Sequence, residues 1–432
     1  MIYFPYNIIL TCLLLLYAPY LLLRSLIQER FRKKWIQRLG FPPRRSFKKP
    51  IWVHASSVGE VLCSVPLLRR IKKEIPHCEI VLSTMTSTGN ETAKTLIPEA
   101  DQVFFFPVDH PFTIRKALQR MDPCLLLIAE TELWPNVLRS CSRRKIPVVL
   151  FNGRISEKSF RGYLFLKSFF KRYLESVSLF LMQTEEDRDR IIQIGAPPDK
   201  TKVVGNIKFD QAFPSLTGDT VVAIARSLNL QGNEPILIGG STHSGEEEIL
   251  VSIFKDLRKS IAGLILILAP RHLDRLEEVE KMLDKESLSW KRKTSMAANL
   301  TWPKEDSMKK PEVILLDTLG ELMSLYSLGT LVFIGGSLVP VGGHNPLEPL
   351  FSKKCVLFGP HMFNFFDIAR HLISEGGAIQ VSGKEELSSQ LKRLLLDEKV
   401  RNETGEKGYQ FLQKHRGATE RIFEKIKPFL VT

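Results

Sequence analysis

A short apolar strand, a turn and the start of a helix follow one another in the stretch Ile51-Trp52-Val53-His54-Ala55-Ser56-Ser57-Val58-Gly59-Glu60. The same order returns at residues 79–85, 125–129 and 147–151, each an apolar run that leads into a polar turn. Near-continuous apolar strands that alternate with helices are typical of a parallel sheet covered on both faces. Residues 50–212 are therefore predicted to form a doubly wound α/β domain.

The pattern starts again after residues 210–219, a segment that contains Pro214 and Gly218 and is typical of a linker. Further apolar runs lie at residues 236–240, 264–268, 313–316, 331–334 and 356–358. We therefore expect an α/β fold with two doubly wound Rossmann-like domains, residues 50–212 and 213–432. Ligands of open parallel sheets bind beyond the carboxyl ends of the strands, so the turns of both domains are expected to face a shared cleft.

Positive charge is concentrated at the amino-terminal end of the chain. The 432 residues hold 61 Lys and Arg against 47 Asp and Glu, a formal net charge of +14. Residues 1–50 hold ten basic residues and one acidic residue, so they carry +9 of that total and the remainder carries +5. With 44% hydrophobic and 25% charged residues, the composition excludes a disordered or fibrous chain.

The first 23 residues contain no charged side chain. As a helix they would reach roughly 35 Å, enough to cross a hydrocarbon core of about 30 Å. A cleaved signal peptide has its positive charge before the apolar run, whereas here it follows. We expect a retained single-pass anchor over residues 1–27 and a basic juxtamembrane segment over 28–49, with both domains on the cytoplasmic side of the membrane. A helix lying in the membrane interface is the main alternative, because Pro5 and Pro19 interrupt the apolar run.

Cysteine and carboxylate spacing does not indicate a metal site. The six cysteines are scattered, which fits a reducing compartment and no disulfide framework. The only Asp-x-Asp pair, Asp187 and Asp189, lies in a predicted helix, and the sequence has neither a P-loop nor a dinucleotide-binding glycine motif. A tightly bound metal ion is therefore not expected.

Acidic residues stand at two predicted strand ends. Glu60 follows the permissive turn at Gly59, where its carboxylate could face a ligand or could close a capping box with Ser57. Glu130 and Glu132 follow the apolar run at 125–129, and a pair of acids at the end of a buried strand is unusual outside active sites. We expect one of these two to face a ligand and the other to be structural.

The second domain offers a candidate phosphate site. A glycine loop follows the strand at 331–334, and Asn345 is then predicted to cap a helix with Pro346 at its first position and Glu348 at its third. Such a loop and helix start suit the phosphate of a nucleotide, with Glu348 available for ribose hydroxyls. Arg271 and Lys208 are further candidate anion contacts. These features together describe a membrane-tethered glycosyltransferase of the two-Rossmann-domain kind.

Five motifs, in order along the chain, resemble those of the bacterial Kdo transferases, which move 3-deoxy-D-manno-octulosonic acid (Kdo) from CMP-Kdo to lipid A precursor. They are residues 52–60, 130–136, 160–163, 205–210 and 342–349. The family is inverting and has the GT-B fold, so the resemblance implies the same fold and a role in lipopolysaccharide core biosynthesis. Gly153 stands where the family usually has alanine, a change that could loosen acceptor preference.

The resemblance also implies a role for each matching residue. It implies that Glu60 is the general base and that Glu130 and Lys208 assist the transition state. It implies that CMP is held by Pro270, Arg271, Gly320, Glu321, Leu322, Asn345, Pro346, Leu347 and Glu348.

The expected partners are CMP-Kdo as donor substrate, lipid A precursor (lipid IVA) as acceptor, with Kdo itself as a further acceptor, and inner-membrane lipid. No cofactor is expected. Two alternatives remain: a UDP-sugar glycosyltransferase or epimerase of the same fold, and a non-enzymatic basic protein that binds nucleic acid or anionic lipid. Nucleic acid is not expected as a partner, because the basic clustering ends near residue 50.

Overall fold

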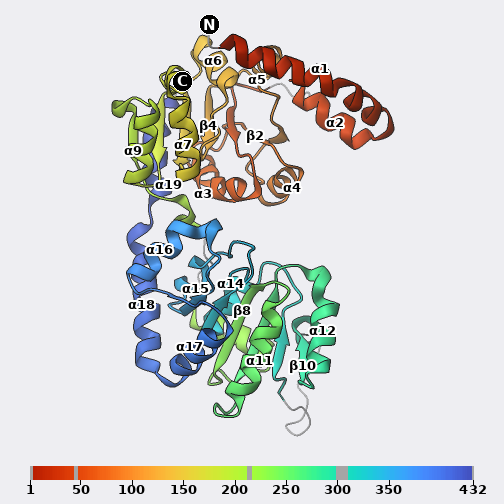
Figure 1. Ribbon diagram of the computed structural model, residues 1–432, viewed down its shortest axis with the longest axis vertical. Helices are drawn as coiled ribbons and strands as arrows, with labels where there is room; N and C mark the ends of the chain where they lie inside the picture. The colour runs from red at the N-terminus through yellow and green to blue at the C-terminus, as the bar shows by residue number, and fades with distance from the viewer. Residues whose placement is uncertain (1–2, 43–46, 212–216, 298–309, 431–432) are drawn as a thin grey trace. The chain divides into compact units, whose positions relative to one another are not determined.

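The computed structural model describes residues 3–42, 47–211, 217–297 and 310–430. The chain divides into two compact units, residues 1–212 with 415–432, and residues 213–414 (Figure 1). Each unit is built on a seven-stranded parallel sheet with helices between the strands. The α/β class predicted from the alternating pattern is therefore confirmed.

The sheet of the first unit has the strand order β3-β2-β1-β4-β5-β6-β7. Its strands are β1 Ile51–His54, β2 Ile80–Thr84, β3 Gln102–Phe105, β4 Leu125–Ala129, β5 Val148–Gly153, β6 Leu179–Met182 and β7 Thr201–Val203. Its connecting helices are α3 Val58–Glu74, α4 Ser87–Leu96, α5 Pro111–Met121, α6 Pro135–Arg143, α7 Glu157–Phe165, α8 Lys167–Leu174 and α9 Glu185–Ile194. Trp52 packs into the core on one face of this sheet, and Val53 packs into the core on the other. The strand order reverses between β1 and β4, which is where doubly wound sheets bind ligands.

The carboxyl-terminal residues differ from the expected domain division. Helix α19 (Ala418–Ile426) packs on α3, and Phe423 joins the same buried cluster as Ile71. Arg70 Nε also forms an ion pair with Glu420 Oε2 at 2.7 Å. Residues 415–432 therefore belong to the first unit, and the second ends at Lys414 rather than at residue 432.

The sheet of the second unit has the order β10-β11-β9-β8-β12-β13-β14. Its strands are β8 Ile236–Thr242, β9 Ile265–Pro270, β10 Trp290–Arg292, β11 Val313–Leu315, β12 Leu331–Ile334, β13 Cys355–Phe358 and β14 Ile379–Gln380. Its helices are α10 Gly218–Ser227, α11 Glu246–Arg258, α12 Leu276–Lys285, α13 Lys293–Ala297, α14 Leu322–Leu325, α15 Leu347–Phe351, α16 Phe366–Ser374, α17 Lys384–Leu396 and α18 Glu398–His415. The reversal of order lies between β8 and β12, so this unit repeats the plan of the first.

Two helices precede the first sheet, α1 (Tyr3–Ile27) and α2 (Glu29–Arg38). The segment Phe4–Ile27 of α1 is long and apolar enough to cross a membrane, and none of its most apolar window is buried within the protein. Pro19 is accommodated inside α1 without ending it.

Candidate functional site

Glu60 lies at the third position of α3, directly beyond the end of β1. The Ser57 side chain caps the helix by accepting a hydrogen bond from the Glu60 N–H, as a capping residue should. The Glu60 carboxylate accepts from the Ser56 N–H at 2.7 Å and from the Ser57 hydroxyl at 3.0 Å. Its side chain therefore reaches one residue further back than in an ordinary capping box, and it is held in one orientation.

Three carboxylates gather where β1 and β4 end. Glu130 follows β4 in a left-handed conformation, with a φ of 54°. Glu132 accepts a hydrogen bond from the Trp134 indole N–H at 3.0 Å. Burial, together with the charges of Glu130 and Glu132, raises the pKa of Glu60 to about 7, although the hydrogen bonds from Ser56 and Ser57 oppose the rise. A carboxylate with such a pKa can take up a proton at neutral pH, as a general base must.

Lys208 lies on a short 3-10 helix, Ile207–Asp210, which follows β7. The buried Asn152 side chain accepts from the Ile207 N–H at 3.0 Å, and the Asp210 carboxylate accepts from the Gly417 N–H at 2.6 Å. The loop is therefore fixed both to β5 and to the start of α19.

Lys208 lies near two of the carboxylates at the ends of β1 and β4, those of Glu60 and Glu130. Burial raises the pKa of the Cys63 thiol to about 12. The charge of Lys208 opposes that rise, whereas those of Glu130 and Glu60 add to it. All three charged groups thus act on one buried sulfur, so the structure brings Glu60, Glu130 and Lys208 to one neighbourhood.

Gly153, the departure from the family pattern, is the last residue of β5. A Cβ there would lie 2.4 Å from Leu150 Cδ2 and 2.6 Å from Met182 Sδ, so an alanine would require those two side chains to shift. The glycine therefore lets core side chains pack closely beside the site.

In the second unit, a buried carboxylate organises the glycine loop that follows β12. The first residue of α11, Glu246, is fully buried. Its carboxylate oxygens accept hydrogen bonds of 2.7 to 3.0 Å from the backbone N–H groups of His243, Gly336, Ser337 and Leu338. The sequence reasoning did not identify Glu246. The sequence pattern that could have indicated it is an apolar strand, a turn and a helix that begins with acidic residues. The same pattern precedes Glu60 in the first unit.

We expect Glu246→Gln to destabilise the second unit by about 2–6 kcal/mol. Each carboxylate oxygen accepts two backbone N–H groups. An amide NH2 in place of either oxygen would leave two buried donors unpaired, at about 1–3 kcal/mol each. Thermal unfolding and CMP binding measure the effect. Glu248→Ala is the control, because that carboxylate accepts one bond, from the Gly245 N–H. Equal stability of the two variants would contradict this role.

Asn345 caps the helix that follows the glycine loop. Its side-chain oxygen accepts from the Leu347 N–H at 3.1 Å, and its NH2 donates to Glu348 Oε1 at 3.2 Å. Helix α15 begins at Leu347, so Pro346 stands just before it, and the predicted start is one residue too early. Helix ends are uncertain by about this much, because the first turn frays between conformations.

Arg271 lies at the end of β9, after Pro270, and its backbone N–H donates to the Thr242 carbonyl at the end of β8. Burial and, to a smaller extent, the Arg271 charge lower the pKa of His344 to about 4. Burial raises the pKa of Glu348, which Asn345 and Arg271 oppose. Arg271, Asn345, His344 and Glu348 therefore meet at the carboxyl ends of β8, β9 and β12.

The turn with Gly320, Glu321 and Leu322 follows β11, the neighbour of β9 in the sheet. Gly320 has a φ of 84°, which favours glycine, and Leu322 begins α14. The Glu321 carboxylate accepts hydrogen bonds from Lys293 Nζ and from the Thr318 hydroxyl. This side chain therefore has protein partners already, which leaves the backbone of the turn for a ligand.

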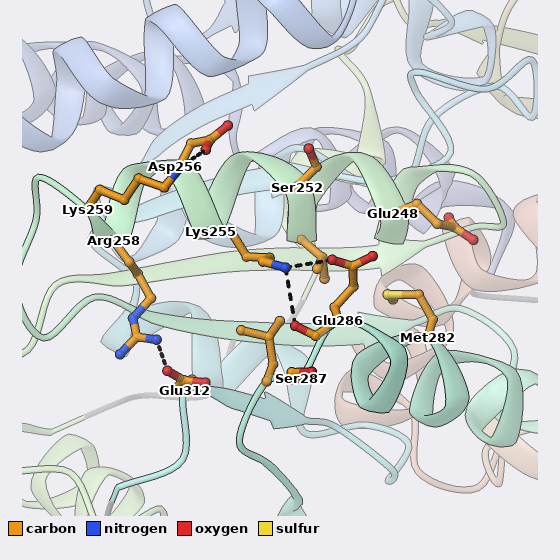
Figure 2. Close-up of a pocket in the computed structure, with 12 residues that line it drawn as sticks. Glu248, Ser252, Lys255, Asp256, Arg258, Lys259, Met282, Glu286, Ser287 and Glu312 are labelled. Carbon is orange, nitrogen blue, oxygen red and sulfur yellow. Dashed lines mark hydrogen bonds and ion pairs between the residues drawn. The ribbon is translucent and has the colours of Figure 1, made fainter.

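A separate groove of about 480 Å³ runs between α11 and α12 (Figure 2). Figure 2 shows Lys255 paired with Glu286 and Arg258 paired with Glu312 across it. The groove lies toward the amino ends of β10 and β11, whereas Arg271 lies at the carboxyl end of β9. Within the described ranges, no group of three or more His, Cys, Asp and Glu residues could hold a metal ion.

Comparison with known proteins identifies the family. Residues 33–211 match the model of the 3-deoxy-D-manno-octulosonic-acid transferase (kdotransferase) family. The 3-deoxy-D-manno-octulosonic acid transferase of Haemophilus influenzae is 35% identical over 97% of this chain and 98% of its own length. That of Chlamydophila psittaci is 30% identical over 99% of this chain and 96% of its own.

A solved structure resembles the fold alone. The UDP-GlcNAc 2-epimerase of Neisseria meningitidis bound to UDP-GlcNAc aligns with 88% of this chain and all of its own, with a TM-score of 0.58 and 14% identity. It supports the two-domain Rossmann-like architecture of the GT-B type. Because the two relatives match over nearly the full length of both chains, this chain belongs to the 3-deoxy-D-manno-octulosonic acid transferase family and is a glycosyltransferase.

Proposed function

We propose that this enzyme transfers Kdo from CMP-Kdo to a sugar hydroxyl of a lipid A precursor, lipid IVA, and then to Kdo itself. Membership in the Kdo transferase family over nearly the whole chain carries this proposal. In the reaction, the acceptor oxygen forms a bond to the anomeric carbon of Kdo while the bond from that carbon to the CMP phosphate oxygen breaks. The acceptor loses a proton, and CMP leaves with the bonding electrons.

Glu60 is the proposed general base. The hydrogen bonds from Ser56 and Ser57 fix its carboxylate, and each oxygen keeps a lone pair for the acceptor proton. The pKa of Glu60 is raised to near neutral pH. A general base is most effective when its pKa lies close to the pH at which the enzyme works. Glu130 would stabilise the positive charge of an oxocarbenium-like transition state, and the Lys208 cation would assist by stabilising negative charge that develops as CMP leaves.

The second unit is proposed to hold the CMP moiety. The Arg271 guanidinium would offset the charge that grows on the leaving phosphate. Glu348 would accept hydrogen bonds from ribose hydroxyls, and Asn345 already orients it. Pro270, Pro346 and Leu347, with the turn at residues 320–322, would shape the walls of the site. The reaction is proposed to need no metal ion.

The enzyme is proposed to act at the cytoplasmic face of an inner membrane, where α1 and the basic α2 attach it. Helix α1 is apolar enough to enter a bilayer. The basic residues of α2 would contact anionic headgroups, each worth about 1 kcal/mol near the surface.

The direct test is to incubate the purified full chain with CMP-Kdo and lipid IVA and to weigh the lipid product by mass spectrometry. We expect product masses larger by one or two Kdo residues, an unchanged yield after chelation of divalent cations, and no product from UDP-sugars. Product from UDP-sugars and none from CMP-Kdo would replace the proposed donor. A yield that falls on chelation and recovers with added cation would contradict metal independence.

A further inference from the structure

The amino-terminal part of α1 is fastened to the first unit by polar contacts. The Tyr6 hydroxyl donates to Asp109 Oδ2 at 3.0 Å, and the Asn136 NH2 donates to Asn7 Oδ1 at 2.7 Å. One turn further, the Thr11 hydroxyl lies 3.3 Å from His110 Nε2. The polar residues Asn7 and Thr11 thus face protein.

These contacts reach a buried side chain of the first unit. Asp109 is buried, and its carboxylate also accepts from the backbone N–H groups of Asn136 and Val137, at 2.9 and 2.8 Å. It thereby caps the start of α6. Helix α1 therefore docks on a carboxyl group that the fold already holds in place.

The other end of α1 is tied to the same unit through α2. Within α2, Arg38 donates to the Met85 carbonyl at 2.6 Å, and Gln37 accepts from the Phe105 N–H at 2.9 Å. Tyr20 of α1 packs edge-on against Phe31 of α2. Figure 1 shows α1 and α2 side by side at one end of the first unit.

One face of α1 packs and the other does not. The half-buried residues of α1 recur at helical spacing: Tyr6, Asn7, Leu10, Thr11, Leu14, Ala18, Leu21 and Ser25. Between them lie exposed apolar side chains, among them Leu16 at 80% exposure and Leu26 at 83%. Because the packed face runs the length of the helix, the apolar face does so too.

This double attachment opposes a membrane-spanning orientation. Asn7 and Arg24 are 17 residues apart, so roughly 25 Å of helix separates them. If α1 crossed a hydrocarbon core of about 30 Å, these residues would lie near opposite surfaces of the bilayer. Asp109 and Arg38 belong to one folded unit, and its charged surface cannot extend through hydrocarbon.

We propose that α1 lies in the plane of one leaflet, with its exposed apolar face embedded and its packed face on the first unit. The occupant of the exposed face is an anionic lipid bilayer, so the proposal rests on the membrane attachment proposed above. The exposed tip Leu164-Phe165-Leu166 would enter the same leaflet, with Phe165 at 90% exposure. It adjoins α1 through Phe169, whose ring lies 6.3 Å from that of Tyr6.

Charge complementarity supports the lipid surface as this occupant. Lys167, Lys171 and Arg172 on α8 are exposed beside the apolar tip. Toward the other end of α1, where Phe31 of α2 packs on Tyr20, Arg32 and Lys33 of α2 are exposed as well. Cations that flank an apolar face are typical of helices bound to anionic membrane interfaces.

The position of the amino terminus tests this orientation. An epitope tag is placed before Met1 of the full chain, and protease is added to intact spheroplasts and to inverted inner-membrane vesicles. We expect the tag to survive in spheroplasts and to be lost in inverted vesicles, because an in-plane α1 keeps its amino terminus in the cytoplasm. Loss of the tag from intact spheroplasts would overturn the proposal. Kdo transfer by the same membranes is assayed separately, so a failed orientation is distinguishable from a failed function.

A variant set tests whether the polar contacts hold α1 in the plane. The combined variant Tyr6→Phe, Asn7→Leu, Thr11→Val removes the contacts and makes α1 more apolar. We expect its tag to become accessible in part from outside, since the basic α2 stays cytoplasmic while α1 is free to cross. Cys12→Val, on the exposed face, is the matched control and should leave the tag inside. A triple variant that behaves like the control would overturn the role of these contacts.

Discussion

Replacing Glu60 by Gln should lower the rate of Kdo transfer by about 10²–10⁴-fold, the usual contribution of a general base. Gln keeps the size of the side chain and can still accept one hydrogen bond, but it cannot take the acceptor proton. The residues proposed to bind CMP lie in the second unit, so CMP affinity should stay within about twofold of the unmodified enzyme. Transfer rates and CMP binding by calorimetry measure the two effects.

Ser57→Ala separates catalysis from helix capping. It removes the hydroxyl that accepts from the Glu60 N–H, which should cost about 1 kcal/mol of stability. The Glu60 carboxylate would keep its hydrogen bond from the Ser56 N–H and remain ionisable. We expect transfer to fall much less than in Glu60→Gln. Near-normal turnover in Glu60→Gln would show that this carboxylate only caps the helix.

The pH dependence follows from the pKa of Glu60. Burial raises that pKa to about 7. At pH 7, Glu60 is therefore protonated in about half of the enzyme molecules, and in these it cannot act as a base. Transfer should therefore rise between pH 6 and 8 and then level. A carboxyl whose pKa is raised on folding opposes folding once it ionises, from about pH 4.5 upward and fully above pH 7. Glu60→Gln removes that cost, so at pH 8 the variant should unfold at a temperature no lower than the unmodified enzyme.

The sequence predicts local structure well where one element determines it. The stretch 51–60 alternates between the two cores and then presents Ser57 as a cap, and the structure has both features. The unit to which residues 415–432 belong could not be predicted in the same way. The apolar face of α19 fits any core, and only packing on α3, more than 300 residues away in sequence, assigns it to the first unit.

The same limit applies to the candidate site. Arg271, Asn345 and Glu348 come from turns that the strand pattern locates, so their convergence could be expected from topology. Glu246 could not be recognised, because three of its four partners are backbone N–H groups about 90 residues away. The contact of Asn7 with α6 could not be predicted either. In a helix that is apolar on nearly all sides, the sequence does not show which side packs on protein.

Arg271→Ala should raise the KM for CMP-Kdo by about 10- to 150-fold. A hydrogen bond between charged groups contributes about 1.5–3 kcal/mol, and each 1.4 kcal/mol is tenfold in affinity. The exposed side chain lies at the carboxyl ends of β8 and β9, where its charge already acts on His344 and Glu348. Removing the charge should also raise the pKa of His344 from about 4, which imidazole NMR signals would report.

Arg275→Ala is the matched control, four residues further along the chain. Its guanidinium pairs with Glu247 at 3.0 Å and with Glu278 at 3.0 Å, so its role is structural. The control should lower thermal stability and change the KM by less than threefold. Arg271→Ala should instead raise the KM and leave thermal stability nearly unchanged, because the proposed partner of its side chain is the donor. If the two variants shift the KM equally, the charge at residue 271 has no special relation to the phosphate of CMP-Kdo, and the donor must be held by other groups.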